Sequence, residues 1–309
     1  MKKISVILVS YNTCQLTLQT IQSVYEKTKG ISFEIILVDN NSIDNTVDQV
    51  ESLFPDVICI RNNENKGFGF ANNKGAEIAT GDYIFLLNTD TLLISNALKI
   101  LSDYLDEPKN KDVVAVCGNL FNEKNEPATS FLKFFPGIVL EINELLFNAL
   151  HHFKSFNHYF NFSLKPIKFR GSISGADAMI RKKEFDEIGG FDKDYFLYYE
   201  ETDLFYRFIK NGFLVASVPD AEIVHLEGAS ETKKELTLER SFVSKYIFLK
   251  KHKSYIYTNV VHSLYVLTCI SRVFIFSILK KKEKIEYWKL LRKIEKNTFK
   301  KMRNKYEKK

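Results

Sequence analysis

Three carboxylates and two tyrosines stand close together between Tyr198 and Asp203. Glu200, Glu201 and Asp203 could supply a general base, which requires a carboxylate of suitable pKa within reach of a hydroxyl group. The alternative is structural. Acidic residues favour the first turn of a helix, and Asp203 could form an ion pair with Arg207 four residues later. The residue types alone leave both interpretations open.

Four polar segments could form a second functional cluster, because each follows an apolar run that is typical of a buried strand. They are Ser10-Tyr11-Asn12, Asp39-Asn40-Asn41, Asn62–Asn73 and Asn88-Thr89-Asp90. In open parallel sheets, ligands bind beyond the carboxyl ends of the strands. Asp and Asn also favour ordinary turns and helix caps. Four such loops at one edge nevertheless favour a binding crevice.

The elements that must position these residues alternate between strand and helix. Strands are expected at Ile4–Val9, Phe33–Val38, Val57–Ile60 and Tyr83–Leu87; helices are expected up to Lys27, from Asp44 or Asn45, over Ala71–Ala79 and from Ala97 to Leu105. Each strand is a nearly continuous apolar run. The pattern therefore predicts an α/β fold with a mainly parallel central sheet that is covered on both faces.

Two common nucleotide-binding classes lose most of their support. No Gly-x-Gly-x-x-Gly follows the first strand, and no Gly-x-x-x-x-Gly-Lys-Ser/Thr occurs in the sequence. A nicotinamide dehydrogenase and a P-loop NTPase are therefore disfavoured. Gly67-Phe68-Gly69 follows the third strand instead, where it suits a close approach of the backbone to a ligand.

Composition and charge narrow the class of protein further. The 309 residues are 45% hydrophobic and 27% charged, and the four cysteines are widely spaced without a Cys-x-x-Cys pair. This composition favours a globular protein with reduced thiols in the cytosol over a disulfide framework or a zinc ribbon. The first apolar run is short for a signal-peptide core.

The positive charge is concentrated at the end of the chain. Residues 280–309 contain fourteen Lys or Arg and four Glu, so the overall net charge of +6 leaves −4 for the first 279 residues. The basic balance therefore belongs to a tail, and we expect no nucleic-acid binding by the main domain.

Residues 131–169 are unusually rich in phenylalanine and also contain His151, His152 and His158. A packed helical insertion is the simpler interpretation, and an apolar flap on the acceptor side is the alternative. Without nearby cysteines or carboxylates, the three histidines are expected to be packing or surface residues.

Six motifs occur in the order found in family 2 glycosyltransferases. They are Val6–Asn12, Val38–Asp44, Asn65–Phe68 with Asn72-Asn73, Gly81–Asp90, Gly189–Asp192 and Tyr199–Leu204. Across about residues 3–230, the chain resembles the bacterial rhamnosyltransferase-like branch of this family. The resemblance implies a GT-A fold, an inverting transfer, and a nucleotide-sugar donor held with a divalent metal, Mn²⁺ or Mg²⁺.

The resemblance also implies roles for individual residues. Asp39 matches the base-binding aspartate, with Tyr11 beside it. Asn88-Thr89-Asp90 stands where the family has its Asp-x-Asp signature, which makes Asp90 the expected direct metal ligand and His225 a further metal or phosphate contact. Glu201 occupies the position of the catalytic base, with Glu200 and Asp203 as rivals. The expected nucleotide-sugar contacts are Ser10, Tyr11, Asn12, Asp39, Asn41, Lys66, Gly67, Asn72, Asn88, Thr89, Asp90, Gly175 and Ala176.

We expect a GT-A domain over residues 1–230, with a nucleotide-binding half to about residue 115 and an acceptor half after it. Residues 231–309 form a basic helical extension. The apolar stretch Tyr255–Leu279 is long enough to span a bilayer, but Arg272 within it would cost about 2.5–3.5 kcal/mol in hydrocarbon. We therefore expect helices that lie on an anionic membrane surface. The alternative is an extension that packs on the domain or on a second copy.

Taken with the resemblance, the sequence predicts an enzyme that transfers a sugar, with dTDP-rhamnose as one candidate donor, to a saccharide or lipid-linked saccharide. Its expected setting is cell-surface polysaccharide synthesis at the inner face of the plasma membrane. Two alternatives stay open. A sugar-nucleotide pyrophosphorylase would require a Gly-rich, basic loop after the first strand, which Ser10–Thr13 is not. The second alternative is a non-catalytic membrane module that binds a nucleotide sugar.

Overall fold

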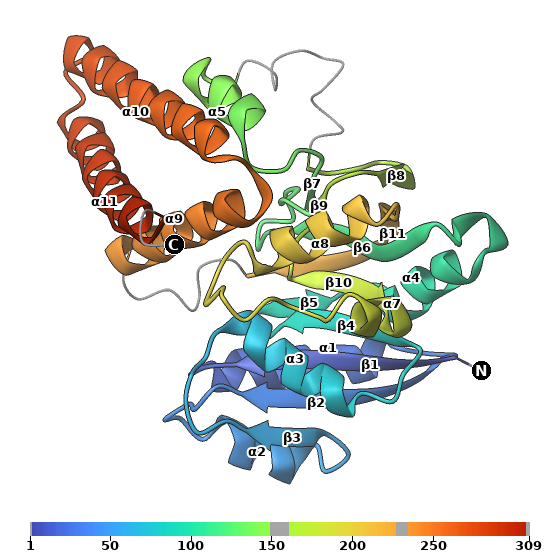
Figure 1. Cartoon of the computed structure of the whole chain (residues 1–309). Helices are drawn as coiled ribbons and strands as arrows, with labels where there is room; N and C mark the ends of the chain where they lie inside the picture. Colours follow the sequence, from blue (N-terminus) through green and yellow to red (C-terminus); the bar gives the residue numbers. More distant parts are fainter. Residues whose placement is uncertain (1, 149–160, 227–233, 307–309) are drawn as a thin grey trace. The chain divides into compact units, whose positions relative to one another are not determined.

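A computed structural model describes residues 2–148, 161–226 and 234–306 (Figure 1). The chain divides into two compact units. Unit 1 comprises Met1–Lys133, His158–Phe196 and Glu200–Ser230, and unit 2 comprises Phe134–Asn157, Leu197–Tyr199 and Glu231–Lys309. His151, His152 and His158 lie outside the described residues.

Unit 1 is built on a nine-stranded sheet. Its strands are β1 (Lys3–Ser10), β2 (Ser32–Asp39), β3 (Ile58–Arg61), β4 (Tyr83–Asn88), β5 (Thr91–Leu93), β6 (Val113–Phe121), β8 (Ile167–Phe169), β10 (Asp177–Arg181) and β11 (Leu214–His225). The strand order is β3-β2-β1-β4-β10-β6-β11-β5, and β8 pairs with β11. A small second sheet joins β7 (Phe131–Leu132) to β9 (Ser172–Ile173).

The strand directions confirm the predicted mainly parallel sheet. β1, β2, β3, β4, β6 and β11 run in one direction, while β5, β8 and β10 run in the opposite direction. β10 lies between β4 and β6 and is antiparallel to both. This insertion brings the segment after Gly175 next to the carboxyl end of β4.

Helices cover both faces of the sheet, as the apolar strands require. The helices of unit 1 are α1 (Cys14–Lys27), α2 (Thr46–Leu53), α3 (Phe68–Ile78), α4 (Ala97–Asp106), the short 3₁₀ turn η1 (Pro108–Asn110), α7 (Lys182–Glu187) and α8 (Glu200–Lys210). On β1, the buried side chains of Ile4, Val6 and Leu8 belong to one core cluster with residues of α1, α2 and α4. Ile7 instead meets α3, which crosses the viewed side of the sheet in Figure 1.

The predicted elements agree with the structure to within a few residues. The third helix begins at Phe68 rather than at Ala71, because Gly67 with a φ of 97° turns the chain directly from the loop into α3. The second helix begins at Thr46 with Asn45 as its N-cap residue. Helix α8 begins at Glu200 as expected.

Within its described residues, unit 2 contains the helices α5 (Ile138–Leu145), α9 (Lys234–His252), α10 (Tyr255–Ile278) and α11 (Lys282–Tyr306). Helix α5 packs on α10, and α10 and α9 pack on α11. The interior of the unit combines apolar and polar groups. Lys245 Nζ lies 2.5 Å from Glu141 Oε1, and His262 Nδ1 lies 2.7 Å from Glu295 Oε1.

Candidate functional site

The carboxyl ends of the first four strands meet at one edge of the sheet. Ser10 pairs in register with Asp39, Asp39 pairs with Arg61, and Val9 pairs with Asn88. The loops that follow these residues therefore lie side by side, as predicted for a binding crevice. Thr13 and Thr89 tie two of the loops together, because their Oγ1 atoms lie 3.2 Å apart.

Asp39 is held in place by the loops around it. The residue is 5% exposed, and its carboxylate accepts hydrogen bonds from Ser10 Oγ at 2.8 Å, from Ser42 Oγ at 2.5 Å and from the Ser42 backbone N–H at 2.9 Å. Tyr11 is half-exposed and directly follows Ser10, which pairs with Asp39 in the sheet. Asn12 and Asn41 both have positive φ angles, a conformation that Asn tolerates well. Asn12 Oδ1 accepts from the Ile43 N–H at 2.8 Å, which closes the loop after β1 onto the loop after β2.

Asn40 was not among the predicted site residues, although it organises this edge. It is buried, and its Nδ2 donates to Gly67 O at 3.2 Å while its Oδ1 accepts from Asn62 Nδ2 at 3.0 Å. The sequence signal for this role was its place in the polar segment Asp39-Asn40-Asn41, at the end of a predicted strand. The network fixes the loop after β3 against the loop after β2.

Gly67 needs to be glycine for steric reasons. Its φ is 97°, and a Cβ atom there would lie 2.0 Å from the carbonyl oxygen of Phe196. The Phe68 N–H donates to that same oxygen at 3.1 Å. The start of α3 and the segment before α8 are therefore in direct backbone contact, which brings the third loop close to the carboxylates of α8.

Asn88 is the last residue of β4, and Thr89 and Asp90 connect this strand to β5. Asp90 Oδ1 lies 3.2 Å from His225 Nε2, and both side chains are mostly buried. The pairing of β11 with β5 creates this contact, because His225 is opposite Thr91 in the antiparallel register. The structure thus brings together the two residues that were expected to bind metal.

The Gly175-Ala176 segment adjoins both Asn88 and the α8 carboxylates. The Asn88 N–H donates to Ala176 O at 3.1 Å. A Cβ atom on Gly175 would lie 3.3 Å from the Phe68 ring and 4.0 Å from Glu201 Cβ. Glu201 and the start of α3 therefore both lie close to Gly175, beside the carboxyl end of β4.

The three candidate bases have different environments. Asp203 is fully buried, with its Oδ2 2.7 Å from Arg207 Nε and its Oδ1 accepting from Tyr195 OH at 3.2 Å. The predicted ion pair with Arg207 is confirmed. Arg207 also donates to the carbonyl oxygens of Ile188 and Gly190, so this pair holds α8 against the preceding loop.

Glu200 is also buried, and its Oε2 has no hydrogen-bond partner among the described residues. Burial and the neighbouring Glu201 charge raise its pKa well above the usual value. Burial likewise raises the pKa of Glu201, but this side chain keeps partial solvent exposure. Glu201 is therefore the candidate base that a substrate hydroxyl can reach most directly.

Two other predicted nucleotide-sugar contacts, Lys66 and Asn72, interact with residues close to them in the sequence. Lys66 is exposed and pairs with Glu64 at 2.8 Å. Asn72 is buried in α3, where its Nδ2 donates to Phe68 O at 3.0 Å, and its Oδ1 has no hydrogen-bond partner within the described residues.

A buried carboxyl group behind the site was missed. Asp177 on β10 is fully buried, and its Oδ2 accepts from the Gly118 N–H at 2.8 Å. Burial raises its pKa to about 8, although the Gly118 hydrogen bond and the charge of His225 act in the opposite direction. The available signal was an aspartate at the start of an otherwise apolar run directly after Gly175-Ala176.

The donor set at Asp90 and His225 fits a single divalent cation. Across residues 2–148, 161–226 and 234–306, no three His, Cys, Asp or Glu side chains gather closely enough to hold a metal by themselves. A carboxylate and an imidazole would therefore need oxygens from a diphosphate and from water to complete the coordination. Mg²⁺ is commonly bound in this way, through one or two carboxylates and substrate phosphates.

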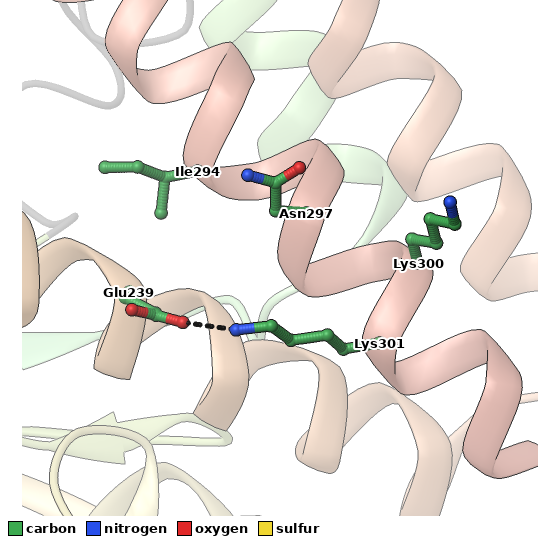
Figure 2. A pocket seen from close by; sticks show the side chains of 5 residues that line it. All are labelled: Glu239, Ile294, Asn297, Lys300 and Lys301. Carbon is green, nitrogen blue, oxygen red and sulfur yellow. Dashed lines mark hydrogen bonds and ion pairs between the residues drawn. The ribbon is translucent and has the colours of Figure 1, made fainter.

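A cavity of about 470 Å³ lies elsewhere, between α9 and α11 of unit 2 (Figure 2). It is lined by Glu239, Ile294, Asn297, Lys300 and Lys301, and Lys301 Nζ forms an ion pair with Glu239 Oε1 at 2.9 Å. None of these residues belongs to the predicted site.

Comparisons with known proteins agree with this arrangement. Residues 5–165 match the profile of Glycosyl transferase family 2. The chain is 25% identical over 234 residues to N-acetylglucosaminyl-diphospho-decaprenol L-rhamnosyltransferase of Mycobacterium tuberculosis, covering 71% of this chain and 75% of that protein. It is 34% identical over 106 residues to the Escherichia coli UDP-Glc:alpha-D-GlcNAc-diphosphoundecaprenol beta-1,3-glucosyltransferase WfaP, covering 33% of this chain and 42% of that one.

Among solved structures, the fold is similar to that of mannosyltransferase PcManGT from Pyrobaculum calidifontis in complex with GDP-Man and Mn²⁺. The TM-score is 0.58 at 15% identity, and the match covers 96% of this chain and 85% of that one. The predicted GT-A fold is confirmed. The chain therefore belongs to glycosyl transferase family 2 and is similar to the rhamnosyltransferase-like branch of that family.

Proposed function

We propose that this protein transfers a sugar from a nucleotide-diphosphate donor to a hydroxyl group of a lipid-linked saccharide, with inversion at the anomeric carbon. The observation that carries the proposal is the Asp90–His225 pair at the carboxyl edge of the sheet, with 3.2 Å between Oδ1 and Nε2. The M. tuberculosis and E. coli relatives are both named for transfer to a GlcNAc-diphospho-polyprenol. Those names support a role in cell-surface polysaccharide synthesis and make dTDP-rhamnose the first donor to test.

The loops after β1 and β2 are suited to the nucleotide. Asp39 already accepts three hydrogen bonds, one from Ser10 and two from Ser42, and an ionised carboxylate has about four acceptor positions. It can therefore accept a further N–H from a nucleobase. The half-exposed Tyr11 ring offers an aromatic surface beside that position. The sugar-diphosphate then extends along the edge towards Asp90.

Asp90 and His225 would hold the divalent cation together with the donor diphosphate. A bound Mn²⁺ or Mg²⁺ supplies positive charge that neutralises the diphosphate leaving group. A structural neighbour of the same fold contains Mn²⁺ and a nucleotide sugar, which supports this assignment. The pairing of β5, which follows β4, with β11 fixes the positions of the two side chains relative to each other.

Glu201 is the general base in this proposal. Its carboxylate takes the proton from the acceptor hydroxyl as that oxygen forms a bond to the anomeric carbon. The bond between the anomeric carbon and the diphosphate oxygen breaks, and the nucleoside diphosphate leaves with the electron pair. A single displacement inverts the configuration. Asp203 is bound to Arg207 and Tyr195, so in this proposal it stabilises α8 and does not act on the substrate.

The setting of the enzyme is part of the proposal. We assign residues 1–230 to the transferase domain and residues 231–309 to an extension that associates with an anionic membrane surface. The acceptor would be presented at the inner face of the plasma membrane, where nucleotide sugars are available. Unit 1 alone contains the proposed donor and base residues.

Thermal-shift measurements with dTDP-, UDP- and GDP-linked sugars, each with and without Mn²⁺, test the donor assignment. We expect one nucleotide class to raise the melting temperature, and the rise should be larger with the metal. No stabilisation by any nucleotide would refute the proposal. A non-catalytic binding module would be the better description if a donor bound but Asp90→Ala and Glu201→Gln left every measurable activity unchanged.

A further inference from the structure

Helix α10 exposes apolar side chains, whereas an ordinary surface helix exposes polar ones. Its exposed large side chains are apolar, with Ile256 at 76% and Phe274 at 66% exposure. The other exposed positions are Tyr255, Val260, Ser263, Leu267, Ile270, Ser277 and Ile278. Within Tyr255–Ile278, none of the exposed residues is charged. Surface helices of globular proteins normally place charged and polar residues on this side.

Four polar residues of α10, including its arginine, are buried in the interior of unit 2. Thr258, Tyr265, Thr268 and Arg272 are buried. The Arg272 guanidinium donates hydrogen bonds to the carbonyl oxygens of Glu144 and Leu145, and it lies 3.4 Å from the Phe147 ring centroid. The one charged residue of the helix is therefore satisfied inside the protein, on the side away from the exposed apolar face.

Helix α5 shows the same inversion. Glu141 and Asn143 are buried, whereas Val139, Ile142 and the C-cap residue Leu146 are exposed. Glu141 pairs with Lys245 of α9 inside the unit, and the Ile138 N–H donates to Tyr257 OH of α10 at 3.0 Å. Two neighbouring helices of one unit thus bury their polar groups and expose their apolar ones. Water is a poor solvent for such a surface.

Basic residues stand at both ends of the apolar face. Lys250, Lys251 and Lys253 precede α10, and the run Lys280–Lys282 follows it. The helix has 24 residues, so these clusters lie about 36 Å apart along its axis. Such a face complements a surface that is apolar inside and anionic at its rim. A two-fold contact with a second copy would instead bring lysine clusters together, and like charges across an interface are unfavourable.

We propose that the outer face of α10, with the exposed side chains of α5, is a lipid-binding surface that rests on an anionic bilayer. α10 lies along the interface with its apolar side chains in the acyl boundary, and the flanking lysines meet the headgroups. A shallow hollow of about 460 Å³ along this face, lined by residues that include Ile256, Val260 and Leu267, suits an acyl chain. This inference rests on the proposed function for its membrane setting, while its evidence comes from unit 2 alone.

The test is co-sedimentation of the full chain with vesicles of phosphatidylcholine alone and of phosphatidylcholine mixed with phosphatidylglycerol. We expect tighter binding to the mixed vesicles, weakened by salt. Ile256→Glu should weaken binding at least about tenfold, since it places a charge where the exposed isoleucine would enter the acyl boundary. Ile78→Glu is the matched control, because Ile78 is an exposed isoleucine of α3 in unit 1. Its binding should equal that of the wild type.

Phe274→Glu provides a second variant on the same face, and thermal melting identifies any variant that is unfolded. Wild-type protein that binds neither vesicle, or folded variants that bind as tightly as wild type, would overturn the proposal. So would a wild-type dimer that Ile256→Glu converts to a monomer, which would assign the face to a second copy. Donor-induced thermal shifts should be unchanged in Ile256→Glu. Vesicle binding without any donor binding would refute only the proposed function.

Discussion

His225 Nε2 lies 3.2 Å from Asp90 Oδ1, although the two residues are far apart in the sequence. Asp90 directly precedes β5, and the antiparallel pairing of β5 with β11 places His225 opposite Thr91. Two side chains with the chemistry of metal ligands therefore meet at the edge where the first four strands end.

Asp90→Asn should abolish the Mn²⁺-dependent part of the donor-induced thermal shift and lower kcat/KM by on the order of a hundredfold or more. The amide has no charge with which to hold the cation near the diphosphate. Asp220→Asn, an exposed acid on β11, is the matched control and should behave like wild type. If Asp90→Asn keeps full metal-dependent stabilisation, Asp90 is not the ligand.

Glu201→Gln should lower kcat by about 10²–10⁴-fold while leaving donor affinity unchanged, because the amide cannot take the acceptor proton. Single-turnover assays and donor titrations separate these two quantities. Asp203→Asn should act differently. It leaves Arg207 without its buried partner and should lower the free energy of unfolding by roughly 3–5 kcal/mol. Full turnover in Glu201→Gln would shift the role of base to Glu200.

The pH profile of kcat/KM should have an acid limb, and the pH at which activity falls should lie above the usual pKa of a glutamate. Burial raises the pKa of Glu201, and the base acts only when it is deprotonated. Activity should therefore fall as pH decreases through this raised pKa. Glu201→Gln removes the ionisation, so the residual activity of that variant should not show the limb. An acid limb at the usual glutamate pKa would argue against Glu201 as the base.

Protonation of Glu34 should make unit 1 less stable at low pH. Burial alone would raise the pKa of this carboxyl, but hydrogen bonds from Lys3, Ser5 and Thr80 lower it to about 2. The folded pKa lies below the model-peptide value of 4.5, so the contribution to stability is present above that value and is lost as pH falls towards 2. Glu34→Gln should lower the melting temperature at pH 7, and the difference from wild type should shrink at pH 3.

Gly67→Ala should destabilise the protein more than Gly189→Ala. Both glycines have positive φ angles, so each substitution carries backbone strain of about 1 kcal/mol. Only at Gly67 does the new Cβ meet the Phe196 carbonyl at 2.0 Å, whereas nothing lies within 4 Å at Gly189. Urea unfolding of the two variants separates strain from clash. Equal losses of stability would mean that the loop before α8 moves aside without cost.

The sequence by itself determined the local elements and their order. Apolar runs such as Ile4–Val9 and Tyr83–Leu87 mark strands, since a strand buried on both faces needs apolar side chains throughout. The i, i+4 spacing of Asp203 and Arg207 was enough to predict their ion pair. The strand-end positions of Asp39 and Asp90 likewise indicated the functional edge, because parallel strands end on the same side of a sheet.

Tertiary structure decided what depends on pairing between distant strands and helices. The insertion of β10 between β4 and β6 places Ala176 against Asn88 and buries Asp177 behind the site. The β5–β11 register brings His225 to Asp90. Sequence periodicity does not specify which strand becomes a neighbour, since that choice depends on the packing of the whole sheet.

The polarity of α10 was decided in the same way. Its sequence shows an apolar stretch that Arg272 interrupts, and only the contacts with α5 show that this arginine faces inward while Ile256 and Phe274 face outward. Local sequence is sufficient for strands and helices because their periods are short. The direction that each side chain faces is a property of its neighbours in space, and for this helix those neighbours come from distant parts of the chain.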